Sequence, residues 1–121
     1  MLLRPQDLKR SLAFYKDSLS LAIYREFGEG QSRGTVFFLG GGYLELSGTA
    51  SQAAGPNVAL WMQVRDLSAT ASELSSRGVL ITRPPRREAW GLDEMWVTDP
   101  DGVRIYIVEV PPEHPLRLRE S

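Results

Sequence analysis

Few side chains in this sequence have the chemistry to act on a bound molecule. The 121 residues contain no cysteine, which excludes a thiolate nucleophile and a cysteine metal site. The one histidine, His114, stands alone in the proline-flanked stretch PPEHPL, so no Ser-His-Asp set is available. Glu45, in the stretch YLELS, is the best catalytic candidate, because an enclosed carboxyl group can act as a general acid or base without a metal. The sequence names no partner for it, so the catalytic residues stay open.

The same residues argue against a resident metal ion. Borderline metals prefer imidazole, and hard metals prefer several carboxylate oxygens. His114 is expected to be a solvated or packed residue of the tail. Glu109 is three residues from Tyr106, and this odd spacing places the two side chains on opposite faces of one strand. A register slip of one residue would exchange the faces and turn Glu109 inward in place of Tyr106. We therefore predict no cofactor, with a divalent metal as the alternative.

Alternating apolar and polar residues indicate which side chains would line a pocket. In 43–47, 58–64 and 103–110, leucines, isoleucines and a methionine alternate with aromatic and polar residues, so the two sets lie on opposite strand faces. Aromatic walls with a few polar groups are typical of small-molecule sites. The predicted ligand-binding residues are Tyr43, Glu45, Trp61, Gln63, Trp90, Trp96, Arg104 and Tyr106. The alternative is that Trp61 and Tyr106 simply fill the fold as core residues.

The stretch RPPRREAWG, residues 83–91, is expected to be a loop at the mouth of such a pocket. Its arginines, Arg83, Arg86 and Arg87, could grip a carboxylate or phosphate of a ligand, or could simply be solvated. Trp90 could cover the ligand as a lid or fill an interface.

Two stretches of the chain repeat each other and predict two matching helices. QDLKRSLAFYKDSLSL and RDLSATASELSSRGVL align without a gap, with apolar residues on one helical face. Asp7 and Asp66 precede these faces, where we expect their carboxylates to cap the helices. Gly78 follows the second helix, where a left-handed residue is favoured.

Strand-like runs complete each half as β-α-β-β-β. The runs are 2–6, 22–27, 35–39 and 43–47 in the first half, and 58–64, 79–83, 94–98 and 103–110 in the second. Module one is residues 1–47, a linker is 48–57, module two is 58–110 and a tail is 111–121. The stretch DPDG, 99–102, has the residues of a tight turn. We predict a single α+β domain whose two βαβββ modules form a curled mixed sheet cup with helices on the convex side.

These modules resemble the glyoxalase / bleomycin resistance protein / extradiol dioxygenase superfamily, the vicinal oxygen chelate fold. The resemblance is carried by DLKRSLAFYKDSLSL, VRDLSATASELSSRGV and WGLDEMWVTDPDGVRIYIVEVP and covers nearly the whole chain. Metal-dependent members of this superfamily bind a divalent ion through four positions, and the resemblance implies where these positions fall in this sequence. Only Glu45 matches one of them; the others fall at or before Met1, near Ala59, and on Tyr106.

Three hypotheses follow from the resemblance and the residues. The first, which we favour, is a metal-free protein similar to the bleomycin resistance branch, which binds a small aromatic or cationic molecule and so confers antibiotic resistance. The second is a metal-dependent lyase, isomerase or dioxygenase similar to the glyoxalase branch. The third is a non-catalytic subunit with a filled cup. The resemblance also implies a homodimer, and the short first strand leaves an edge that favours pairing.

Composition limits the other classes of partner. Lys and Arg number 14 and Asp and Glu 15, so the net charge of −1 favours neither nucleic acid nor an anionic membrane. No apolar run approaches the roughly 20 residues of a membrane span. The opening residues, MLLRPQD, turn polar too soon for a signal peptide. The absence of cysteine fits a cytoplasmic protein.

Overall fold

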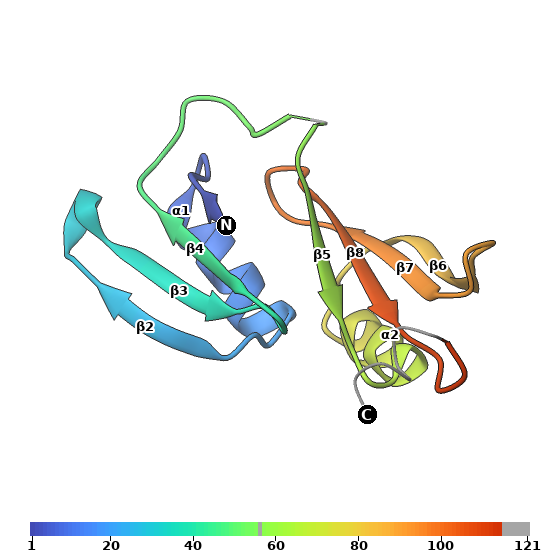
Figure 1. Cartoon of the computed structure of the whole chain (residues 1–121). Helices are drawn as coiled ribbons and strands as arrows, with labels where there is room; N and C mark the ends of the chain where they lie inside the picture. The colour runs from blue at the N-terminus through green and yellow to red at the C-terminus, as the bar shows by residue number, and fades with distance from the viewer. Residues whose placement is uncertain (56, 115–121) are drawn as a thin grey trace.

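The computed structural model describes residues 1–55 and 57–114, and it contains two βαβββ modules (Figure 1). Module one consists of β1 (Leu2–Leu3), α1 (Leu8–Ala13), a π-helical segment (Phe14–Ser18), β2 (Ile23–Phe27), a short 3₁₀ turn (Gly30–Ser32), β3 (Gly34–Phe38) and β4 (Tyr43–Ser47). Module two consists of β5 (Ala59–Gln63), α2 (Leu67–Ser76), β6 (Ile81–Arg87), β7 (Asp93–Thr98) and β8 (Arg104–Glu109). The predicted α+β pair of modules is therefore confirmed.

Each module forms its own four-stranded mixed sheet. The strand orders are β1-β4-β3-β2 and β5-β8-β7-β6. The pairs β1–β4 and β5–β8 are parallel because a helix connects each opening strand to the three that follow, while the other pairs are antiparallel. In Figure 1 the two sheets lie side by side, and the linker arches between β4 and β5. Among the described residues, no helix is both long and apolar enough to cross a membrane.

Both helices begin at the aspartates that the sequence predicts. The side chain of Asp7 accepts a hydrogen bond from the backbone N–H of Arg10, and that of Asp66 accepts one from Ala69. Each carboxylate satisfies a donor that the first turn of a helix leaves unpaired. Gly78, with φ of +78°, follows α2 in the left-handed conformation. These aspartates therefore have a structural role.

The apolar faces of both sheets pack toward the helices in one core. Leu44, Leu60, Ile105 and Ile107 are at most 2% exposed, and they belong to a cluster that includes residues of both modules. Burying a side chain of this size stabilises the fold by about 1.5–3 kcal/mol. The predicted assignment of leucines and isoleucines to the helix side is confirmed, so the alternate residues lie on the other face of each sheet.

Polar contacts also join the modules around the turn between β7 and β8. The Tyr15 hydroxyl donates to the Asp99 carboxylate over 2.7 Å, in a fully buried position. Arg10 donates to the carbonyl of Pro100 over 2.7 Å, and the backbone N–H of Gln6 donates to Asp101 over 3.0 Å. Burial raises the pKa of Tyr15 well above its usual range, and the negative charge of Asp99 raises it further. The N-terminal helix thus holds the predicted DPDG turn in place.

The prediction that residues 83–91 form a loop is wrong for their first half. Strand β6 continues through Pro84 and Pro85 to Arg87, with irregular register against β7. Proline has no N–H to donate, but β6 is the outer strand of its sheet and has a partner on one side only. The remaining residues, 88–92, connect β6 to β7. The opening strand of module one is also shorter than predicted, because it ends at Leu3, ahead of Pro5.

Candidate functional site

The two sheets turn aromatic side chains away from the helices on their open faces. Tyr43 on β4 and Trp61 on β5 are 50% and 49% exposed, although their neighbours Leu44 and Leu60 are buried. Gln63 lies two residues beyond Trp61 and is exposed on the same face. Exposed large apolar side chains that cluster on one face of a protein are typical of interaction sites.

A hollow of about 420 Å³ lies on the open face of module one. Its lining consists of Met1, Leu2, Tyr24, Arg25, Val36, Tyr43 and Glu45. Glu45 is half-buried, and its Oε2 accepts a hydrogen bond of 2.9 Å from the Ser47 hydroxyl. The hollow therefore combines aromatic walls, one carboxylate and one guanidinium.

Three aromatic rings form a cluster beside this hollow. The rings of Tyr24, Phe38 and Tyr43 lie with centroids 4.9–5.6 Å apart. Our sequence reasoning named only Tyr43. The register shift between Ile23 and Arg25 explains part of this omission, because a bulge disturbs simple alternation and lets both Tyr24 and Arg25 line the hollow. Phe38 could have been found, since it alternates with the buried Phe37.

The open face of module two centres on Trp96. Its ring contacts Tyr106 edge-on, with centroids 5.2 Å apart. The guanidinium carbons of Arg83 and Arg104 lie 4.3 and 4.9 Å from the Trp96 ring centroid. These arginines come from β6 and β8, the strands on either side of β7. Cation–π contacts hold such side chains in defined positions.

A second hollow, of about 160 Å³, lies beside this group. It is lined by Gly55, Val58, Ala59, Thr98, Gly102, Arg104 and Tyr106. Of the predicted ligand-binding residues, Tyr43 and Glu45 thus line the hollow of module one, and Arg104 and Tyr106 line that of module two. Trp61 pairs with Tyr106 in the β5–β8 register, and Trp96 contacts Tyr106.

The arginines of residues 83–91 have carboxylate partners within the protein. Arg83 and Arg86 both form ion pairs with the buried Glu88. Arg87 pairs with Asp93, and this hydrogen bond raises the pKa of the Arg87 guanidinium. These charges support the β6–β7 hairpin, so they offer less to a ligand than the sequence suggested.

Trp90 lies on the β6–β7 connection, 59% exposed. Its indole N–H donates to the buried carboxylate of Glu94 over 2.6 Å. His114 lies behind the same loop, with Nε2 3.1 Å from the carbonyl oxygen of Trp90. Trp90 is therefore anchored by its indole N–H while its ring is exposed. This arrangement suits both a lid over a ligand and a residue that fills an interface.

The side chains around Glu45 do not fit a metal ion. Its neighbours across the sheet are Leu2 on β1 and Val36 on β3, which carry no donor atoms. Tyr106, at the other matching position, has Trp61 and Trp96 beside it. Within residues 1–55 and 57–114, no three His, Asp or Glu side chains gather as a metal site. Glu109 lies on the helix side, where it accepts a hydrogen bond from the backbone N–H of Leu67.

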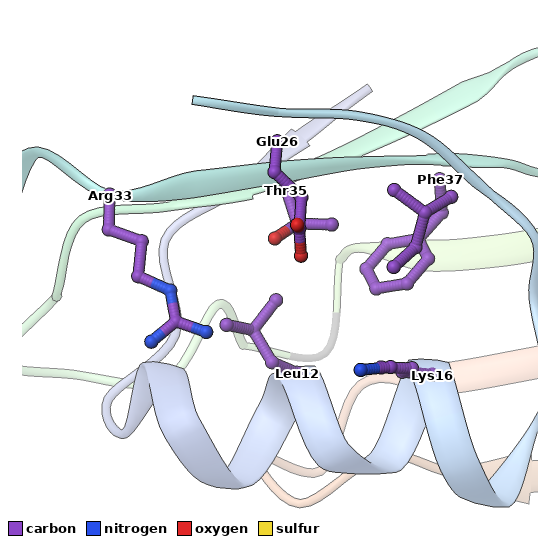
Figure 2. Close-up of a pocket in the computed structure, with 7 residues that line it drawn as sticks. Leu12, Lys16, Glu26, Arg33, Thr35 and Phe37 are labelled. Atoms are coloured by element: carbon purple, nitrogen blue, oxygen red, sulfur yellow. The ribbon is translucent and has the colours of Figure 1, made fainter. Parts of the chain in front are cut away.

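A further pocket lies on the helix side of module one (Figure 2). Figure 2 shows Arg33 and Lys16 at opposite ends of this pocket, with Leu12 between them and Glu26 and Thr35 on the sheet above. Its volume of about 40 Å³ has room for little more than a water molecule or two. The open faces are therefore the better candidates for a ligand site.

The chain is similar in sequence to a curated protein from Vibrio cholerae named probable lactoylglutathione lyase. The two are 28% identical over an alignment 119 residues long, and the match covers 89% of this chain and 86% of the relative.

Solved structures with the same fold include a superfamily member from Sphaerobacter thermophilus, with a TM-score of 0.73, 23% identity, and 90% and 93% of the two chains covered. TnmS3, an antibiotic binding protein from a Streptomyces species, has a TM-score of 0.76 at 19% identity, with 92% and 93% covered.

The sequence profile of one family matches residues 1–107, which include module one and all of module two except the last two residues of β8. Together with the two βαβββ modules, this match shows that the chain belongs to the Glyoxalase/Bleomycin resistance protein/Dioxygenase superfamily.

Proposed function

We propose that this protein binds a small planar aromatic molecule on the open faces of its sheets. The observation that carries the proposal is the exposed cluster of Tyr24, Phe38 and Tyr43 beside a hollow of about 420 Å³. A planar ligand that stacks on these rings removes apolar surface from water and gains ring contacts. The hollow falls within the size range of small-molecule sites, roughly 300–1,000 Å³.

The charge of Glu45 supports a ligand that carries a cationic group on this side. Glu45 is the one carboxylate among the described residues of a lining that also holds Arg25 and aromatic and apolar residues, and a cation beside Glu45 would meet both its carboxylate and the aromatic ring faces. The exposure of Tyr43 and Trp61 favours an open binding face over a cup filled by the protein's own side chains. TnmS3, which has the same fold, is an antibiotic binding protein, and this agrees with a small-molecule ligand for the present chain.

A homodimer is part of the proposal. Each open face exposes large apolar side chains, and a second copy would cover them and close the hollows into a deeper site. Light scattering at micromolar concentration is expected to give twice the mass of 13.5 kDa. A mass of one chain at that concentration would contradict the proposed homodimer.

The test of binding uses the neutral probe 2-naphthamide. Because a ligand that binds only the folded state stabilises it, the probe is expected to raise the melting temperature of the wild-type protein. Tyr43→Ser should abolish most of this rise, whereas Leu80→Ser, which changes an exposed leucine outside both hollows, should preserve it. An unchanged melting temperature at millimolar probe would contradict the proposal.

A second candidate function rests on the 28% identity to the probable lactoylglutathione lyase. The donor set around Glu45 does not fit the metal that the glyoxalase branch is expected to use, so we rank this function lower. An assay for lactoylglutathione formation or cleavage, with Ni²⁺ or Zn²⁺ added, separates the two. Metal-dependent turnover that Glu45→Gln removes would favour the lyase.

A further inference from the structure

We propose that the hollow of module two binds an acidic group of the ligand, with Arg104 as its charged partner. The inference rests on the proposed function, because it assigns one end of the same aromatic ligand. It predicts that a carboxylate or a similar anion on the ring system selects the ligand.

The charge of Arg104 is the first observation. Among the described residues, the polar side-chain partner of this guanidinium is the Tyr106 hydroxyl, 3.3 Å from Nη1, and no carboxylate lies within ion-pair distance. Arg83, on the other side of Trp96, differs because Glu88 neutralises it. Of the two guanidinium groups over the Trp96 ring, that of Arg104 is therefore the one whose positive charge can pair with a ligand.

The lining of the hollow is the second observation. None of the described residues that line it is acidic, and the polar side chains among them are Thr98, Arg104 and Tyr106. Because the Tyr106 hydroxyl accepts from Arg104, its own hydrogen remains free to be donated to a ligand. Guanidinium and hydroxyl donors around small neighbours such as Ala59 make a site that suits an anion.

The position of Arg104 is fixed before any ligand arrives. Its guanidinium carbon lies 4.9 Å from the Trp96 ring centroid, and the Tyr106 ring braces Trp96 edge-on. A side chain held in this way loses less conformational freedom on binding.

The size of the hollow indicates which part of a ligand it holds. Its volume of about 160 Å³ is below the roughly 300–1,000 Å³ of a site for a whole drug-sized ligand. It suits an acidic group and the edge of its ring, and the remaining aromatic surface stays outside for the tyrosines and tryptophans of the open faces.

The experiment compares three probes that share a naphthalene ring and carry a negative, a neutral or a positive substituent: 2-naphthoate, 2-naphthamide and 2-naphthylmethylammonium. Titration calorimetry at pH 7 measures each with the wild-type protein and with three variants. The wild-type protein is expected to bind naphthoate about tenfold more tightly than naphthamide. Arg104→Gln should bring these two affinities to within about twofold, and Arg104→Lys should keep part of the preference.

Arg65→Gln is the matched control, since it removes the same charge from an exposed arginine that borders neither open-face hollow. It should keep the full preference for naphthoate. Equal binding of naphthoate and naphthamide by the wild-type protein would overturn the inference, as would a preference for naphthoate over naphthamide that survives Arg104→Gln. These results leave aromatic binding intact, whereas binding of none of the three probes would overturn the proposed function itself.

Discussion

The hydroxyl of Tyr15 on the N-terminal helical segment donates to the carboxylate of Asp99, 84 residues away, over 2.7 Å and out of contact with water. The other oxygen of Asp99 accepts hydrogen bonds from the backbone N–H groups of Asp101 and Val103. One carboxylate thus fixes the turn that leads into β8 and ties that turn to module one. Because β8 carries Arg104 and Tyr106, this pair helps to position the open face of module two.

Tyr15→Phe is expected to lower the free energy of unfolding by about 1.5–3 kcal/mol, because it leaves a buried carboxylate oxygen without its donor. Urea denaturation of the variant and the wild-type protein measures the loss. Tyr24→Phe is the control, since Tyr24 is 53% exposed, and it should lose less than about 0.5 kcal/mol. Equal stabilities of Tyr15→Phe and wild type would contradict the role of the pair.

Stability should also fall at alkaline pH through Tyr15. Its pKa in the folded protein is raised by burial and by Asp99, so the folded state keeps the proton above pH 10 while the unfolded state loses it. The contribution is therefore fully present below about pH 10 and is lost as the pH rises, by up to about 1.4 kcal/mol per pH unit.

Denaturation curves between pH 8 and 11 test this slope. Other groups titrate in the same range, so the comparison with Tyr15→Phe isolates the contribution of this one hydroxyl. The variant is expected to lose less stability per pH unit than the wild-type protein above pH 10. Parallel curves for the two proteins would show that Tyr15 does not contribute.

Glu45 and Glu109 lie on opposite faces, so their substitution should have opposite consequences. Glu109 accepts a hydrogen bond of 2.8 Å from the backbone N–H of Leu67 at the start of α2. Glu109→Ala should cost about 1 kcal/mol of stability without changing probe affinity, because it removes an anion from a helix N-terminus. Glu45→Gln, which keeps an acceptor for the buried Ser47 hydroxyl, should weaken binding of 2-naphthylmethylammonium and cost less than about 0.5 kcal/mol of stability. The reverse pattern would show that the face assignment is wrong.

Metal removal should leave the protein unchanged. The neighbours of Glu45 across the sheet, Leu2 and Val36, supply no ligand atoms. Dialysis against EDTA is therefore expected to leave the melting temperature of the wild-type protein and of Glu45→Gln unaltered, and elemental analysis should find less than one Ni, Zn or Mn per chain. A melting temperature that EDTA lowers in the wild-type protein alone would establish a metal at Glu45.

The local pattern of apolar and polar residues predicted most of the helices and strands. The run 43–47 coincides with β4, and alternation separated Tyr43 and Glu45 from the buried Leu44. Such signals succeed because each depends on residues close together in the chain. The run 83–91 was misread because a proline pair breaks a central strand, whereas this strand turned out to be at an edge.

The contacts that define the candidate site join residues that are not neighbours in the sequence. The Tyr15–Asp99 pair joins two modules, and the position of Arg83 over Trp96 depends on irregular register between β6 and β7. A hydrophobicity pattern also does not show which arginines have carboxylate partners. In the described part of the chain Glu88 pairs with Arg83, whereas no carboxylate pairs with Arg104. Tertiary packing sets these relationships. The sequence could therefore name the arginines of the site, but it could not show which of them are paired with carboxylates and which are available to a ligand.

The proline pair in β6 has a consequence for how the protein behaves in crowded solution. An outer strand normally offers a row of N–H and C=O groups onto which a strand of another molecule can add. Because neighbouring N–H groups of a strand point to opposite sides, Pro84 and Pro85 together remove one donor from that row and one from the side that faces β7, and the register beside them is irregular. This rim of the molecule is therefore a poor template for strand addition by another molecule and for the growth of fibrils.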